Sequence, residues 1–154
     1  MLNRIKSLFE ANENPGIKNL TKNSEIQLAA AALLVESASI DGLFDQIERQ
    51  RISNLLKTHF SLAVVETETL IKQAELAVEG SGQLYSFTKT VKDRYDECDR
   101  INLVEMLWEV AFADGNVDAF EKNLIQRVAG LLFVSDKDRG LAKKRVMARL
   151  GILG

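Results

Sequence analysis

The sequence predicts an all-α fold, a compact bundle of about seven helices with two pseudo-symmetric helix–acidic turn–helix repeats. Apolar residues recur every three or four positions over most of the chain, and few segments alternate apolar and polar residues as strands do. The one proline and most of the nine glycines fall between the periodic segments. A length of 154 residues with 46% hydrophobic and 27% charged residues is typical of a single globular domain.

Breakers and N-cap residues divide the chain into its expected elements. Residues 1–21 are expected to form a short helix and a linker with Pro15 and Gly16, and residues 22–154 the helical domain. Ser24 is the expected N-cap of the first domain helix, and Ser135, with Asp138 at capping-box spacing, that of the last. The periodicity predicts helices at about 24–39, 45–59, 64–78, 84–95, 99–113, 118–133 and 135–150. The second of these helices is expected to bury Ile47, Ile52, Leu55 and Leu56.

Charge and composition exclude several classes of function. A net charge of −2 gives no concentrated basic surface, so nucleic acid is not an expected partner. The longest apolar run, residues 28–35, is too short to span a bilayer, and no signal peptide opens the chain, so we expect a cytoplasmic protein. Six basic residues near the C-terminus are expected to form a solvated helix face: Lys137, Arg139, Lys143, Lys144, Arg145 and Arg149.

The residues that commonly carry catalysis or bind transition metals are scarce. Cys98 is the only cysteine and lies among acidic residues, which disfavour its thiolate. His59 is the only histidine, and we expect it to cap the end of its helix rather than act as a base. Trp108 has the spacing of a core residue, and no phosphate-binding loop or zinc motif is present. No catalytic or cofactor-binding residues are therefore assigned.

A repeated acidic motif is the most specific feature of the chain. Residues 36–49 align with residues 109–122, and glutamate, aspartate, glycine, aspartate and glutamate coincide in the two copies. Apolar positions on either side also match, for example Leu34 with Leu107 and Ile52 with Ile125. This agreement in both charge and core pattern predicts a duplicated helix pair.

Turn construction explains much of the motif. The glycine supplies a left-handed residue after a helix, the second aspartate suits the N-cap of the next helix, and the second glutamate stands at the third helical position. These residues are Gly42, Asp45 and Glu48 in the first copy and Gly115, Asp118 and Glu121 in the second.

The other acids need a compensating positive charge. Glu36 and Glu109 fall in the last turn of their helices, where a carboxylate costs ~0.3–1 kcal/mol, and Asp41 and Asp114 stand just beyond. A hard cation such as Ca²⁺ or Mg²⁺ would favour these carboxylate and carbonyl oxygens. Ion pairs with neighbouring bases are the alternative, and the candidate bases are Arg49, Arg51 and Lys122.

The chain resembles the TerB-like family, in particular its small single-domain bacterial members. The resemblance is carried by residues 107–121, with the second acidic motif and Trp108, and by residues 41–48, 84–88 and 129–135. It implies a helical domain with internal two-fold pseudosymmetry and an association with tellurite and other chemical stress. It also implies a set of acidic metal ligands, which in this chain are Glu36, Asp41, Asp45, Glu48, Glu109, Asp114, Asp118 and Glu121.

The resulting hypothesis is a non-enzymatic binding or scaffold module that binds an unidentified protein partner. Its acidic turns would bind a divalent cation. A metal-dependent hydrolase that uses the same carboxylates to activate water is a competing hypothesis. A peripheral membrane adaptor that uses its N-terminal helix, without stable insertion, is a third.

Overall fold

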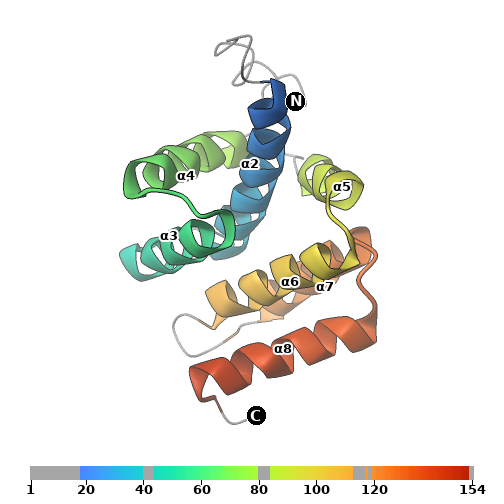
Figure 1. Ribbon diagram of the computed structural model, residues 1–154. Helices are drawn as coiled ribbons and strands as arrows, with labels where there is room; N and C mark the ends of the chain where they lie inside the picture. The colour runs from blue at the N-terminus through green and yellow to red at the C-terminus, as the bar shows by residue number, and fades with distance from the viewer. Residues whose placement is uncertain (1–17, 40–43, 80–83, 113–116, 118, 153–154) are drawn as a thin grey trace.

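The computed structural model describes residues 18–39, 44–79, 84–112, 117 and 119–152. Within this part of the chain it is entirely helical, as the periodicity predicts (Figure 1). The helices are α2 (Lys18–Ala38), α3 (Gln46–Phe60), α4 (Val64–Glu79), α5 (Leu84–Arg94), α6 (Glu97–Ala111), α7 (Ala119–Leu131) and α8 (Asp136–Leu150).

Helix α2 is the centre of the bundle. Every residue from 28 to 35 is at most 2% exposed, so the helix is buried on all sides rather than along one stripe. Four consecutive alanines, residues 29–32, let neighbouring helices approach closely, and α2 packs against α3, α4, α5, α6 and α7. The apolar run that is too short for a membrane span is therefore the core of the domain. Within the described residues, no helix combines the length and apolarity that a membrane span requires.

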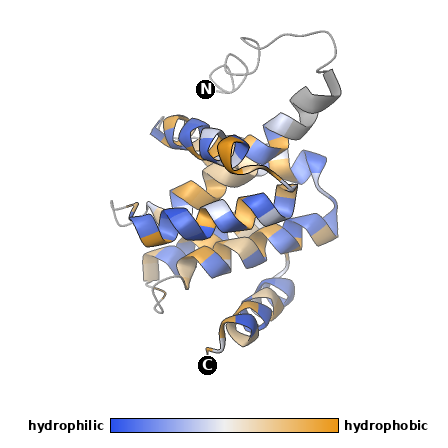
Figure 2. Ribbon diagram, turned by 60° about the vertical axis from the view of Figure 1, so that its left-hand side comes forward, coloured by the Kyte–Doolittle hydropathy of each residue, from blue (hydrophilic) through white to orange (hydrophobic). Residues whose placement is uncertain are grey.

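The outer helices have one buried face each. In Figure 2, hydrophilic and hydrophobic residues alternate along these helices, as expected for amphipathic elements around a core. The aligned positions Leu34, Leu107, Ile52 and Ile125 are all at most 1% exposed. The pseudo-two-fold relation between the two helix pairs stays a prediction.

Two helix starts have the N-cap residues that the sequence predicts. Asp45 is the N-cap of α3, and its Oδ1 accepts a hydrogen bond of 2.8 Å from the backbone N–H of Glu48. Ser135 caps α8 in the same way, with 3.1 Å between the Asp138 nitrogen and the Ser135 oxygen. Asp96 caps α6, so this helix begins slightly earlier than the periodicity predicts.

Two expectations about the first helices are wrong. Helix α2 begins at Lys18, so Ser24 lies inside the helix instead of capping it; no breaker separates Lys18 from Ser24. Ile47 was expected to be buried, but it is 66% exposed. It is five residues before Ile52, which turns its side chain by about 140° away from the buried face of α3. The division of the chain at residues 21 and 22, inside α2, stays a prediction.

Helix α7 is followed by a residue with a strained backbone conformation. The backbone N–H of Val134 donates to Ala129 O (2.8 Å) and that of Phe133 donates to Gly130 O (3.1 Å), which is the Schellman pattern. Phe133 occupies the left-handed position of this motif with φ of 57°, where glycine is usual, and its side chain is 72% exposed. A left-handed non-glycine residue costs roughly 1–2 kcal/mol.

Replacing Phe133 with glycine should therefore stabilise the protein by about 1 kcal/mol, because glycine adopts the left-handed conformation without a steric penalty. Urea unfolding would measure the change. Phe133→Ala is the matched control, since it removes the ring and keeps the Cβ that causes the strain. A similar gain in the alanine variant would show that ring exposure, not backbone strain, is the cost.

Candidate functional site

The first acidic turn is flanked by the end of α2 and the start of α3. Glu36 lies in the last turn of α2 and is half-buried. Within the described part of the chain, its carboxylate makes no hydrogen bond or ion pair. Burial raises the pKa of this carboxyl above its ordinary value of 4.5, because desolvation disfavours the charged form. Glu36 thus places a partly desolvated acid at the negative end of a helix.

Asp45 and Glu48 form the other side of the first turn. Asp45 is exposed, and one of its oxygens is committed to the N-cap of α3. Glu48 stands in the first turn of α3, where an acid is stabilised by the positive end of the helix dipole. The N-cap role expected for Asp45 is therefore confirmed.

Arg49, an expected counter-charge for the first turn, forms ion pairs with α4. Its guanidinium pairs with Glu75 and lies 3.4 Å from the Glu68 carboxylate, both on α4. Its carbon Cζ also lies 5.7 Å from the centre of the Phe44 ring. Arg49 is therefore paired with glutamates of another helix, and its expected role as counter-charge to the acids of this turn stays a prediction.

The second turn follows α6 and differs electrostatically from the first. Glu109 lies in the last turn of α6, and its Oε1 accepts hydrogen bonds from Arg149 Nε (3.1 Å) and Nη2 (2.9 Å). Arg149 also bonds to Glu105 Oε1 at 2.7 Å, and Arg145 donates to Glu105 Oε2 at 3.2 Å. The positive charge for this turn comes from α8, whereas Lys122, an expected source, is exposed on α7.

The rest of the predicted ligand set is partly outside the described residues. Asp41, Asp114 and Asp118 lie there, as do the turn glycines Gly42 and Gly115. Glu121 is in the first turn of α7, in the position that Glu48 has in α3. Among the described residues, no three or more His, Cys, Asp or Glu side chains are grouped so that they could hold a metal ion.

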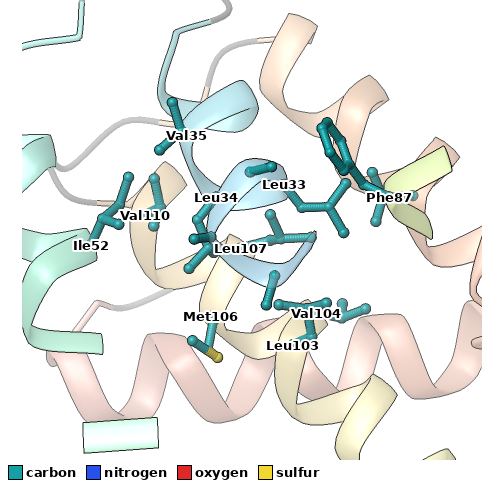
Figure 3. Close-up of a cluster of buried hydrophobic side chains, with 14 of the residues drawn as sticks. Leu33, Leu34, Val35, Ile52, Phe87, Leu103, Val104, Met106, Leu107 and Val110 are labelled. Carbon is teal, nitrogen blue, oxygen red and sulfur yellow. The ribbon is translucent and has the colours of Figure 1, made fainter. Parts of the chain in front are cut away.

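The core brings the two turn-bearing helix ends to the same side of the domain. Figure 3 shows Val35 of α2, Ile52 of α3 and Val110 of α6 gathered at one side of the buried cluster. Glu36 directly follows Val35, and Glu109 directly precedes Val110. The ends of α2 and α6 that carry these acids are therefore neighbours in the fold.

The contacts of His59 and Trp108 show what these two residues do in the fold. His59 Nε2 lies 3.1 Å from the Tyr95 hydroxyl, so His59 bridges α3 to the segment after α5 instead of capping its own helix, which ends with Ser61 N–H bonded to Lys57 O. Burial lowers the pKa of His59. Trp108 is 4% exposed, which confirms its core role, and Lys143 Nζ lies 5.2 Å from its ring centre.

Sequence reasoning missed the contact between α6 and α8. The C-terminal bases were expected to be a solvated face, but Arg145 and Arg149 attach α8 to Glu105 and Glu109. The available signal was the spacing, since both the acids and the bases are four residues apart and can face one another from adjacent helices.

The model of the family described as "Tellurite resistance protein TerB" matches residues 27–144, which run from α2 into α8. The chain belongs to the TerB family. This match includes both acidic turns and confirms the resemblance carried by the repeated motif. No curated protein and no solved structure matches the chain. The TerB assignment therefore rests on the family model and on the helical fold.

Removing the charge of Glu36 should stabilise this TerB protein. A raised pKa in the folded state means that the carboxylate destabilises the fold at neutral pH, and that this cost disappears as pH falls below about 4.5. We expect Glu36→Gln to gain roughly 0.3–1 kcal/mol at pH 7, the cost of an acid at a helix C-terminus. Chemical unfolding at pH 7 and pH 4 would measure it. An equal gain at both pH values would contradict the electrostatic explanation.

Arg149→Gln should destabilise the protein by about 1 kcal/mol or less, because its guanidinium is half-exposed and solvent weakens the ion pairs. The loss should shrink in high salt, which screens exposed charges. Arg127→Gln on α7 is the control, since Arg127 is exposed and has no ion pair among the described residues. Urea unfolding at low and high salt would compare the two variants; a salt-independent loss would contradict an ionic role for Arg149.

Proposed function

We propose that this TerB-family chain is a non-enzymatic binding or scaffold module of a cytoplasmic, tellurite-type stress response, and that a divalent cation regulates it. The first acidic turn is the preferred cation site. The observation that carries the proposal is the half-buried Glu36 carboxylate, which has no bonded partner among the described residues. A carboxylate that is partly desolvated and beside helix carbonyls is stabilised by a bound cation.

The chemistry of the turn favours Ca²⁺ or Mg²⁺. The proposed ligand atoms are carboxylate oxygens, with Glu36 and Asp41 as the principal ligands and Asp45 and Glu48 beside them. Hard divalent cations prefer such oxygen ligands, whereas Zn²⁺ favours nitrogen and sulfur. At the second turn, a cation that used Glu109 would have to displace Arg149, so we propose weaker binding there.

A protein partner fits the scaffold role. Cation binding would change the charge of the surface at the ends of α2 and α6, which lie on the same side of the core. A partner that recognises this surface would then bind differently with and without the cation. The identity of this partner is not specified by the acidic turns.

Thermal unfolding with added Ca²⁺, Mg²⁺, Mn²⁺ or Zn²⁺ tests the cation site. A cation at about one hundred times its dissociation constant should raise Tm by about 5–10 °C in a domain of this size. Glu36→Gln and Asp41→Asn should abolish the rise, and Asp114→Asn should leave most of it.

The control is Glu97→Gln, which removes an exposed acid of α6 away from both turns. For each variant, the Tm with cation is compared with the Tm of the same variant without cation, because Glu36→Gln also changes the stability of the cation-free protein. The absence of a rise with every cation, or an equal rise in Glu36→Gln and Asp41→Asn, would refute the proposed site.

A further inference from the structure

Helix α8 is attached to the domain by a small apolar contact. Its fully buried side chains are the small residues Ala142 and Val146, and Met147, Leu150 and Ile152 are only partly buried. It packs mainly against α6 and less against α7, and it lies as a separate layer at the edge of the bundle (Figure 1). By contrast, α2 is enclosed by five helices. Helix α8 can therefore leave without removing a large, fully buried side chain from the core.

Ion pairs between α8 and α6 add to this apolar contact. Arg145 and Arg149 of α8 face Glu105 and Glu109 of α6, with nitrogen–oxygen distances of 2.7–3.2 Å. The side chains of Glu105 and Glu109 are 12% and 14% exposed. This face of α6 is therefore complementary in charge to a helix with two arginines four residues apart.

The connection between α7 and α8 contains the strained Phe133. Leu132 and Val134 are buried on either side of it, while Phe133 is exposed with φ of 57°. The Nζ atom of Lys92 lies 4.9 Å from the Phe133 ring centre, which leaves most of the ring in contact with solvent. One residue thus carries two costs, a left-handed backbone and an exposed aromatic ring.

We propose that α8 exchanges between two copies of this chain, with Phe133 as the hinge. In the exchanged dimer, Phe133 adopts an extended backbone and α8 of each copy docks on α6 of the other. Every contact of α8 is reproduced, because the partner presents the same Glu105, Glu109 and Trp108. The left-handed strain is released at both hinges, and the hydrogen bonds that Phe133 and Val134 donate to the end of α7 are exchanged for bonds to water.

A second copy is the occupant that the structure favours over an unrelated helix. It supplies the required pair of arginines at the required spacing, together with the small side chains Ala142 and Val146 that fit against α6. This inference does not depend on the proposed cation site.

Charge reversal tests the exchange directly. One variant carries Glu105→Arg and Glu109→Arg, and the other carries Arg145→Glu and Arg149→Glu. Each variant repels its own α8, but in a mixed dimer both α6–α8 contacts pair opposite charges. Light scattering after size exclusion should show a dimer in the mixture and little dimer in either variant alone. A mixture that stays monomeric, or equal dimer in each separate variant, would overturn the proposal.

The wild-type chain provides a second test that does not need the reversed variants to fold. Its dimer fraction at increasing protein concentration should fall in Phe133→Gly, which removes the strain from the monomer. Since each dimer has two hinges, the dissociation constant should rise about tenfold or more. Ser61→Gly is the matched control, because Ser61 is also left-handed (φ of 54°) but lies between α3 and α4. A wild-type chain that remains monomeric at the highest attainable concentration, or an equal effect of both glycine variants, would refute the exchange.

Discussion

Complete burial of residues 28–35 of α2 is the constraint on which the rest of the structure depends. A helix that is apolar on every side must be covered on every side, and five other helices are arranged to do this. The four alanines of residues 29–32 allow the cover to be tight. The same burial decides the environment of Glu36, which is half-buried between the buried residues Val35 and Ser37. The unusual electrostatics of the first acidic turn is thus a consequence of core packing.

The two acidic motifs are nearly the same in sequence but not in environment. Glu109 is bonded to a guanidinium because α8 lies against α6, whereas the ion pairs of Arg49, near the first turn, are with glutamates of α4. A carboxylate with a counter-charge is stabilising or neutral, and one without is costly when partly buried. The repeated motif therefore has one glutamate that is paired with an arginine and one that has no bonded partner among the described residues. This difference is the basis for assigning a cation to the first turn.

Helix α8 is held by different forces from those that hold the core. Most helices are fixed by large apolar side chains, but α8 relies on two small buried residues and on arginine–glutamate pairs. Ion pairs are directional and can be re-formed with an identical partner, whereas a core cannot be rebuilt without unfolding. The left-handed Phe133 adds a local reason for the connection to open. The proposed exchange of α8 would therefore leave the core that stabilises the fold intact.

The sequence by itself determined the all-helical class, the approximate helix bounds and the N-caps Asp45 and Ser135, because periodicity and capping act within a few residues. It also predicted Glu36 and Glu109 at helix ends. Only the tertiary structure decided that Ile47 faces solvent and that Arg149, rather than a base near the turn, compensates Glu109. Those outcomes depend on contacts between helices far apart in the chain, and local spacing carries no information about which helices become neighbours.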